Sequence, residues 1–330
     1  MRAVVCREQK PGAPLGLEDW PLRSLGSADI HVRLRAAGVN FPDRLMVDGA
    51  YHVATPPPFV PGMEAAGEVL AVGSDVTDLR PGDRVMIDGS AEMPGLFAEE
   101  CVFPRALAYA MPAGLDFAEA AALPVVYATG YHALVQRGAL QPGETLLVHG
   151  AAGGTGLSAL HIGAALGAKL IATVGSAAKR EALNALGFEH VIDSSSENVR
   201  DRVLEITAKR GVDVVYDPVG GDLFDASVRC MAKEARLLVI GFTSGRFASM
   251  ASNISLVKEI SMVGVLYGAW KGRHPATAAA NMARIGEMVA QGKFRPHIWR
   301  KFGLGETREA LESLGNRRVI GKTVLLCDQA

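Results

Sequence analysis

A glycine-rich turn at residues 150–156 carries the clearest chemical signal in this sequence. It follows a predicted strand at 146–149 and precedes a helical pattern of small residues at 157–168. Glycines in such a turn allow backbone N–H groups to approach phosphate oxygens, and the helix dipole favours the negative charge of the phosphate. This order of strand, turn and helix predicts a site for the pyrophosphate of a dinucleotide. The expected contacts are Gly153, Gly154, Thr155 and Gly156.

The end of the next predicted strand indicates which dinucleotide is bound. An acidic residue there normally binds the ribose 2′-hydroxyl of NAD, but residues 157–180 contain no Asp or Glu. The strand is followed instead by Ser176, Lys179 and Arg180. A hydroxyl and two cations suit a 2′-phosphate, so the sequence predicts NADPH. The alternative is that the two cations are only the solvated face of a helix.

Length and charge exclude several classes of protein. The chain has 330 residues, a size that predicts two domains. Its formal net charge of −1 gives no electrostatic basis for binding nucleic acid or an anionic membrane. The first residues resemble a strand rather than a secretory signal. The longest uncharged stretch, 120–136, is interrupted by Pro124 and Gly130. We therefore expect a cytoplasmic protein without a membrane span.

The cysteines predict neither a metal cluster nor a disulfide framework. The chain has four of them, and no two are close in sequence. Buried thiols in a reducing compartment are expected. The four residues are Cys6, Cys101, Cys230 and Cys327.

Two patterns of apolar and turn residues along the chain predict the elements that position the candidate site residues. The first third has short apolar runs separated by Gly, Pro and Asp turns, which is typical of an all-β domain. From about residue 120, strands alternate with helices, which predicts right-handed crossovers and a doubly wound parallel sheet. The predicted strands of this sheet are 146–149, 169–174, 191–192, 212–216, 236–240 and, at the edge, 260–266; the predicted helices are 154–168, 178–186 and 198–209. The last third adds a helix at 277–290 and a strand at 322–326.

Several short segments form a recognisable set: AGVNFPD at 37–43, PFVPGMEAAG at 58–67, PGDRV at 81–85, the glycine turn, DPVGG at 217–221 and GK at 321–322. With them the chain resembles, over nearly its full length, the medium-chain dehydrogenase/reductase superfamily. Within it, the chain is similar to the zinc-free quinone oxidoreductase branch that includes zeta-crystallin. The usual alignment of the turn in this branch is Ala151-x-Gly153-x-x-Gly156. The pattern Gly154-x-Gly156-x-x-Ala159 is the competing match.

The resemblance implies an α/β architecture of two domains. Residues 1–120 would form a GroES-like, β-rich catalytic domain, and residues 121–266 a Rossmann domain with a doubly wound parallel sheet that binds NADPH. Residues 267–330 would complete the catalytic domain. Homodimerisation by extension of the Rossmann sheet is also implied, and the predicted edge strand agrees with it; a tetramer is the alternative.

The resemblance also implies a reaction without a metal. Zinc-dependent relatives have a Cys where this chain has Asn40 and a His where it has Met63. Neither an amide nor a thioether is a suitable zinc ligand here. The lobe that holds structural zinc is missing too, because residues 88–100 contain no Cys. Without a Lewis acid, we expect reduction of an electrophilic acceptor rather than oxidation of an alcohol.

Further cofactor contacts follow from the same resemblance. Thr129 matches a position beside the nicotinamide, although an ordinary threonine of a core helix is the alternative. Similar reductases often place a Tyr against the 2′-phosphate where this chain has Ser194. More of that recognition would then come from Ser176 and Lys179, and Arg317 either joins them or is a surface cation. The backbone expected to meet the nicotinamide carboxamide is that of Gly241, Phe242, Val265, Leu266 and Tyr267.

Asn40 and Tyr51 are the candidate hydrogen-bond donors to an oxyanion that develops on the acceptor. Asn40 stands where the zinc thiolate would be, and its alternative role is to cap a turn. Tyr51 matches an active-site tyrosine, and its alternative role is packing. Asp43 and Arg44 are interpreted as a structural ion pair. His132 and His149 are interpreted as structural as well.

NADPH-dependent, metal-free reduction of a quinone is the leading hypothesis. Reduction of α,β-unsaturated carbonyls or enoyl thioesters is the nearest alternative, because the sequence does not show the shape of the acceptor site. A non-catalytic NADPH-binding protein with a structural or interaction role is an alternative of a different class. Small-molecule acceptors are the expected partners.

Overall fold

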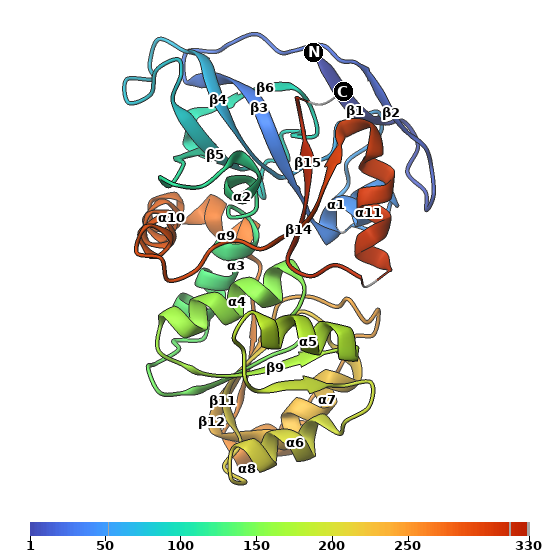
Figure 1. Ribbon diagram of the computed structural model, residues 1–330, viewed down its shortest axis with the longest axis vertical. Coiled ribbons are helices and arrows are strands. Elements are labelled where there is room, and N and C mark those ends of the chain that lie inside the picture. The colour runs from blue at the N-terminus through green and yellow to red at the C-terminus, as the bar shows by residue number, and fades with distance from the viewer. Residues whose placement is uncertain (52, 317, 329–330) are drawn as a thin grey trace. The chain divides into compact units, whose positions relative to one another are not determined.

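The computed structural model describes residues 1–51, 53–316 and 318–328. The chain divides into two compact units (Figure 1). The β-rich unit comprises Met1–Val125 and Lys271–Ala330, and the Rossmann unit comprises Val126–Trp270. Within the described residues, no helix is long and apolar enough to cross a membrane.

A seven-stranded sheet forms the centre of the β-rich unit. Its order is β14-β15-β3-β4-β5-β7, and β6 also pairs with β3. The strands are β14 (Ile298–Gly303), β15 (Lys322–Leu326), β3 (Asp29–Val39), β4 (Glu64–Val72), β5 (Arg84–Asp88), β7 (Ala108–Ala110) and β6 (Glu100–Pro104). A separate pair is formed by β1 (Arg2–Cys6) and β2 (Leu15–Asp19). The β-rich character predicted for the first third and the strand predicted at 322–326 are confirmed.

Alternation along β3 shows why this segment forms a strand. Ile30, Val32 and Leu34 are fully buried, while Arg33 between them is exposed. A period of two places the apolar residues on one face of the sheet.

The helices of this unit are α1 (Phe41–Val47), α2 (Phe117–Ala121), α10 (Pro275–Ala290) and α11 (Thr307–Gly315). A further helix, α9 (Tyr267–Arg273), contains the boundary between the units.

Six parallel strands form the sheet of the Rossmann unit, in the order β10-β9-β8-β11-β12-β13. They are β8 (Thr145–Val148), β9 (Lys169–Val174), β10 (Val191–Asp193), β11 (Val212–Asp217), β12 (Met231–Val239) and β13 (Ser261–Gly264). This is the strand order of a doubly wound nucleotide-binding sheet. The predicted fold class is confirmed, and the predicted edge strand lies at the edge of the sheet, although it is shorter than predicted.

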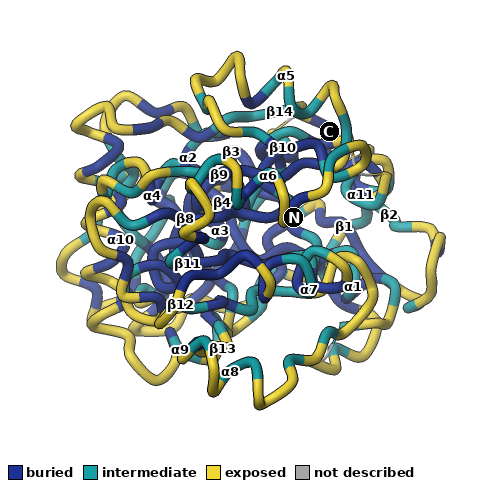
Figure 2. The backbone as a smooth tube through the Cα atoms, turned by 90° about the horizontal axis from the view of Figure 1, so that it is seen from below, coloured by how far each residue is buried: buried dark blue, intermediate teal, exposed yellow. Residues whose placement is uncertain are grey.

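Helices cover both faces of this sheet. Figure 1 shows α4 (Gly154–Ala165) and α5 (Ala177–Ala185) on one side of β9, and α6 (Val199–Ile206), α7 (Gly221–Cys230) and α8 (Ser252–Lys258) on the other. A shorter helix, α3 (Val126–Tyr131), packs on α4. Burial follows the strands, and exposure follows the outer helices and loops (Figure 2).

The helices α7 and α8 of the Rossmann unit are among those that the sequence analysis does not predict. α7 starts at Gly221, directly after Gly220, and both glycines have a positive φ. Two adjacent glycines are typical of a turn and obscure the start of a helix. α8 has no buried residue, so it lacks the apolar periodicity by which a helix is recognised.

Candidate active site

Three polar side chains meet at one end of the sheet in the β-rich unit. Asn40 follows β3, Glu64 is the first residue of β4, and Lys322 is the first residue of β15. The register brings them together, because Gly38 pairs with Glu64 and Val39 pairs with the residue after Lys322. All three are buried, with exposed fractions of 5%, 0% and 4%, respectively. We call this cluster the Asn40–Glu64–Lys322 network.

Short hydrogen bonds saturate the ammonium group of Lys322. Its Nζ donates to Glu64 Oε1 at 2.6 Å, to Asn40 Oδ1 at 2.9 Å and to the carbonyl oxygen of Val39 at 2.9 Å. An ammonium has three hydrogens and therefore no donor left over. Glu64 is also satisfied on its other side, since its Oε2 accepts the N–H of Val125 at 2.7 Å. A buried ion pair needs this completeness to offset the loss of hydration.

The network also fixes the orientation of the Asn40 amide. Lysine can only donate and a carboxylate only accept, so Oδ1 faces Lys322 and Nδ2 faces Glu64 at 2.8 Å. The second hydrogen of Nδ2 points to the carbonyl of Gly38 at a longer distance of 3.4 Å. Asn40 is in addition the residue that precedes α1. Its bonding is that of a structural residue, and its role toward an oxyanion stays a prediction.

Asp43 lies inside the same region. It is fully buried, and its Oδ2 accepts the N–H of Asn40 at 2.7 Å. Burial raises the pKa of Asp43 to about 7, even though Lys322 favours its charged form. The predicted ion pair between Asp43 and Arg44 is wrong. Arg44 instead contacts Asp48 at 3.3 Å, because residues four apart lie on the same face of a helix.

Tyr51 follows α1, is half-buried and packs against the apolar core of the β-rich unit. Burial, together with the negative charge of Asp43, raises the pKa of its hydroxyl. The phenol is therefore protonated at neutral pH.

The glycine turn of the Rossmann unit has a different construction. Gly153 immediately precedes α4, and no side chain caps this helix at Gly153. A Cβ on Gly156 would lie 2.4 Å from the carbonyl oxygen of Gly150, whereas a Cβ on Gly153 would meet only that same oxygen at 3.4 Å. Gly156 therefore permits close packing of helix on turn, and Gly153 faces open space. These are the positions expected for the pattern Ala151-x-Gly153-x-x-Gly156.

Side chains next to the turn are held by the fold. The hydroxyl of Thr155 is 2.6 Å from that of Tyr216. His149 is fully buried, 2.8 Å from Thr173 Oγ1 and 2.6 Å from Ser227 Oγ, and burial lowers its pKa. A neutral imidazole with both nitrogens bonded is a structural histidine, as predicted.

His132 is buried as well and stacks on Trp270 with ring centroids 4.0 Å apart. Its Nδ1 lies 3.3 Å from Gln136 Oε1. This packing agrees with the structural role predicted for it.

The residues predicted to recognise the 2′-phosphate lie at the ends of β9 and β10. Ser176 precedes α5, and its Oγ accepts the N–H of Lys179 at 3.4 Å. Arg180 forms an ion pair with Glu197 at 2.8 Å, so its charge is already neutralised by a residue of the protein. The hydroxyl of Ser194 donates to the carbonyl of Val174 at 2.9 Å. Arg317 lies outside the described residues.

The residues predicted near the nicotinamide follow the carboxyl ends of two neighbouring strands. Gly241 and Phe242 follow β12, while Val265, Leu266 and Tyr267 follow β13. In a parallel sheet these ends share one edge with the glycine turn after β8. Phe242 and Leu266 are exposed, and Tyr267 is buried. Thr129 lies in α3 and is half-buried.

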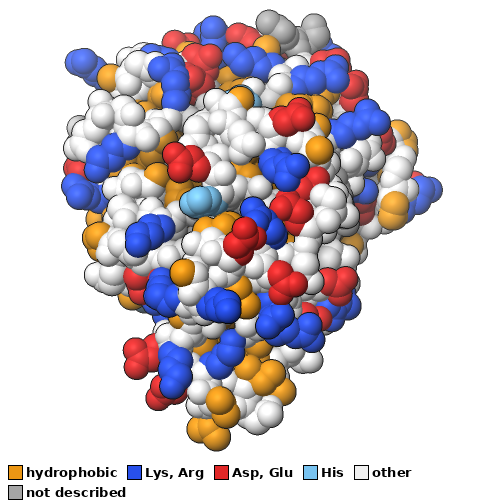
Figure 3. Space-filling view, turned by 60° about the horizontal axis from the view of Figure 1, so that its bottom comes forward, with side chains coloured by type: hydrophobic (Ala, Val, Ile, Leu, Met, Phe, Trp, Pro, Cys, Tyr) orange, Lys and Arg blue, Asp and Glu red, His pale blue; other side chains and the backbone are white. Residues whose placement is uncertain are grey.

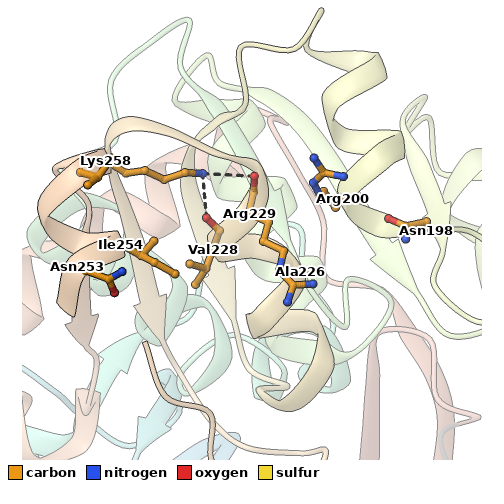
Figure 4. Close-up of a pocket in the computed structure, with 9 residues that line it drawn as sticks. Asn198, Arg200, Ala226, Val228, Arg229, Asn253, Ile254 and Lys258 are labelled. Atoms are coloured by element: carbon orange, nitrogen blue, oxygen red, sulfur yellow. Dashed lines mark hydrogen bonds between the residues drawn. The ribbon is translucent and has the colours of Figure 1, made fainter. Parts of the chain in front are cut away.

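A groove elsewhere in the Rossmann unit is separate from this edge (Figure 4). Its volume is about 630 Å³, and it is lined by residues of α7 and α8 together with Asn198 and Arg200. Lys258 in its wall donates to the carbonyls of Val228 at 3.0 Å and Arg229 at 3.3 Å. These carbonyls lie at the end of α7 that leads into the amino end of β12. Ligands of such sheets bind at the carboxyl ends, so the groove is not the candidate cofactor site.

Comparisons with known proteins agree with this architecture. The family model "Alcohol dehydrogenase GroES-like domain" matches residues 26–113, and "Zinc-binding dehydrogenase" matches residues 154–284. The chain is 38% identical to quinone oxidoreductase-like protein 2 homolog of Nematostella vectensis over 98% of this chain and 88% of the relative. It is 37% identical to a quinone oxidoreductase of Pseudomonas aeruginosa over 96% and 97%. The chain belongs to the quinone oxidoreductase family of medium-chain dehydrogenases/reductases.

Solved structures of this family share the fold. The quinone oxidoreductase of Escherichia coli complexed with NADPH superposes with a TM-score of 0.90 at 28% identity and covers 99% of this chain and 100% of that one. The enzyme of Pseudomonas syringae pv. tomato gives a TM-score of 0.90 at 32% identity over 98% and 99%. A nicotinamide-dependent oxidoreductase follows from this kinship.

The donor set does not fit zinc, although one of the matching family models is described as zinc-binding. The amide of Asn40 is fully engaged by Glu64, Lys322 and Gly38, and Met63 is buried. Burial raises the pKa of Cys101 to about 12 and that of Cys230 to about 11, which disfavours the thiolate that binds metal. The described residues contain no group of three or more His, Cys, Asp or Glu placed to hold a metal ion.

The dinucleotide, by contrast, fits this quinone oxidoreductase. The end of α4 that carries no side-chain cap, with Gly153 facing open space, can receive a phosphate. Gly175 at the end of β9 also has open space where a Cβ would be.

Sequence reasoning assigned no role to Glu64 and Lys322. Each is an isolated charge in an apolar segment, MEAAG and KTVLL. Such a charge is rarely buried unless it is paired. This signal could have indicated that each residue has a partner, but not that the two pair with each other.

Proposed function

We propose that this protein is an NADPH-dependent reductase that transfers a hydride to a quinone without a metal. The observation that carries the proposal is the Asn40–Glu64–Lys322 network. It places a saturated internal ammonium against Asn40, which stands where zinc-dependent relatives have a Cys. The printed names of the similar proteins from Nematostella vectensis and Pseudomonas aeruginosa support the quinone as acceptor.

NADPH supplies the hydride when it is bound, and this chain's residues orient the reactants. Backbone N–H groups of Gly154, Thr155 and Gly156 would hold the pyrophosphate at the start of α4, next to Gly153, whose own N–H already donates to the carbonyl of Gly150 at 2.9 Å. Ser176 and Lys179 would hold the 2′-phosphate, because a hydroxyl and a cation suit it and residues 157–180 contain no Asp or Glu that would repel it. Thr129 and the backbone of Gly241, Phe242 and Val265–Tyr267 would meet the nicotinamide end.

The acceptor needs a proton or a hydrogen-bond donor at its oxygen. A quinone needs little help from an acid, so proximity contributes most of the rate. Tyr51 is the candidate donor, because its raised pKa keeps the phenol protonated at neutral pH. Asn40 can contribute only by turning its second N–H away from the carbonyl of Gly38.

Comparison of three acceptors tests the proposal. Loss of absorbance at 340 nm is followed with NADPH and 1,4-benzoquinone, an alkenal or crotonyl-CoA. We expect the quinone to give the highest kcat/KM. A clear preference for the thioester would contradict the quinone assignment. Tight binding of NADPH without turnover of any acceptor would favour the non-catalytic alternative.

We further propose a homodimer that forms through the edge strand β13. Three of its four residues are exposed, including Met262, and Leu256 and Val257 of α8 are 78% and 72% exposed. Hydrophobic side chains gather at the lower end of the view in Figure 3. Light scattering tests the mass, and Met262→Asp is expected to shift it toward the monomer. The expected cytoplasmic location remains a prediction.

A further inference from the structure

Two exposed phenylalanines lie in the loop that follows β12. Phe242 is 45% exposed and Phe247 is 77% exposed. Their ring centroids are 4.8 Å apart, and the rings are perpendicular. Exposed apolar groups that are gathered together mark binding surfaces more often than scattered ones. We call these two side chains the aromatic pair.

Backbone hydrogen bonds hold the loop of the aromatic pair in place. The N–H of Thr243 donates to the carbonyl of Pro218 at 3.1 Å, and that of Ser244 to the carbonyl of Val219 at 3.0 Å. Between the two phenylalanines, Arg246 Nη2 contacts Asp222 at 2.9 Å and Asp225 at 2.6 Å. The loop is therefore fixed onto the start of α7.

The turn beneath the loop is built for this contact. Gly220 and Gly221 have φ values of +71° and +61°. A Cβ on Gly220 would lie 3.0 Å from the carbonyl oxygen of Arg246, and one on Gly221 would lie 2.9 Å from Ser244 Oγ. Positive φ and close approach both require glycine here. The two exposed rings are thus presented by a preorganised loop, which lowers the entropy cost of binding.

The position of the aromatic pair points to the hydride acceptor. Phe242 follows directly after Gly241, whose backbone is expected at the nicotinamide carboxamide. Both residues lie at the carboxyl end of β12, at the sheet edge where ligands of this fold bind. Leu266, 57% exposed, follows the neighbouring strand β13 at the same edge. The apolar surface therefore borders the end of the site where the acceptor reacts.

We propose that Phe242 and Phe247 bind an apolar side chain of the hydride acceptor, such as an alkyl tail on a quinone ring. The proposal rests on the proposed function and specifies its substrate class. Covering the two rings with a hydrocarbon chain removes apolar surface from water on both partners. The pair would act on affinity for the tail and leave the reacting ring and NADPH unaffected.

Steady-state kinetics with two matched acceptors test the proposal. 1,4-Benzoquinone and 2-decyl-1,4-benzoquinone share the reacting ring and differ in the tail. For Phe247→Ala, we expect kcat/KM for the decyl quinone to fall about tenfold, which corresponds to partial loss of one buried aromatic contact. The kcat/KM for benzoquinone and the KM for NADPH should stay within twofold of wild type. Arg246→Gln, which releases the loop, should also lower the ratio of kcat/KM for the decyl quinone to kcat/KM for benzoquinone.

Leu186→Ala is the matched control, because Leu186 is also exposed, at 40%, but follows the end of α5. It should leave the ratio unchanged. Equal losses for both quinones in Phe247→Ala, or no loss for either, would overturn the proposal. A shift of Phe247→Ala to a smaller mass in light scattering, without any dependence on the tail, would assign the pair to contact with a second copy instead.

Calorimetry separates this proposal from the proposed function. Binding of the decyl quinone to the NADP⁺-loaded protein is measured for wild type and Phe247→Ala. Weaker binding in the variant supports the aromatic pair even if no acceptor is reduced, in which case only the proposed function fails. Equal binding by both proteins, with normal turnover of benzoquinone, overturns the pair and leaves the proposed function standing.

Discussion

The Asn40–Glu64–Lys322 network and the glycine turn satisfy their polar groups in opposite ways. In the network, side chains from three strands use one another's hydrogen-bonding capacity at 2.6–2.9 Å. In the turn, no side chain caps the start of α4. The network therefore holds a charge inside the protein, whereas the turn leaves backbone N–H groups available to a ligand. Mutations should therefore damage the first mainly through stability and the second mainly through binding.

Lys322→Met should have the largest effect, because it leaves the carboxylate of Glu64 buried without its cation. We expect the free energy of unfolding to fall by about 3–5 kcal/mol, measured by urea denaturation. Lys322→Arg retains the charge and should lose less. The double variant Lys322→Met with Glu64→Leu should recover part of the loss, since it removes both charges. A single-variant loss below about 1 kcal/mol would show that the network is not a coupled buried pair.

Asp43→Asn tests the same region through pH. The pKa of Asp43 is raised from 3.8 to about 7 by burial, so the folded state binds this proton more tightly than the unfolded state. The wild type should lose stability as the pH rises from about 4 to about 7. Asparagine can still accept the N–H of Asn40 and has no charge to bury. The variant should gain about 2–3 kcal/mol relative to wild type across this window.

Unfolding measured at pH 5 and pH 8 gives the comparison. Glu181→Gln, on the exposed face of α5, is the control for removal of a surface carboxylate. A difference between Asp43→Asn and wild type that does not change with pH would contradict the raised pKa.

Substitutions of two glycines sharpen the contrast within the turn. In Gly156→Ala the new Cβ meets the carbonyl oxygen of Gly150, so we expect a loss of about 1–3 kcal/mol in stability as well as weaker NADPH binding. In Gly153→Ala the Cβ faces open space and φ is −78°. Its stability should stay within about 0.5 kcal/mol of wild type, while NADPH binding weakens.

Fluorescence titration with NADPH and thermal unfolding measure the two properties separately. Unchanged NADPH affinity in Gly153→Ala would contradict the placement of the pyrophosphate at this end of α4.

Lys179→Glu should have the smallest effect on the protein and a selective one on the cofactor. The KM for NADPH should rise about tenfold, since one charge-assisted hydrogen bond is lost, and that for NADH should change little. Arg180→Gln is the matched control, because Arg180 already pairs with Glu197 at 2.8 Å. Equal changes for both cofactors in Lys179→Glu would refute contact with the 2′-phosphate.

Local patterns were sufficient for the strands of the Rossmann unit. Strands β8, β9 and β11 and the glycine turn are contiguous signals, since each depends on residues that are neighbours in sequence. The missed helices lack such signals, because α7 starts at two glycines and α8 buries nothing. The predicted pairing of Asp43 with Arg44 was wrong because it relied on their being adjacent in sequence. Adjacent residues on a helix do not face each other, whereas Arg44 and Asp48 do.

The sequence by itself determined the parallel sheet and the turn that suits a dinucleotide, because these follow from periodicity and glycine placement. Its short motifs gave the resemblance to the family. Only the tertiary structure decided that Lys322 bonds to Glu64, which is 258 positions away. The pairing of β15 with β3 and of β3 with β4 creates that contact. A hydrogen-bonded network depends on strand register, and register is set by packing across the whole sheet rather than by the residues next to each charge.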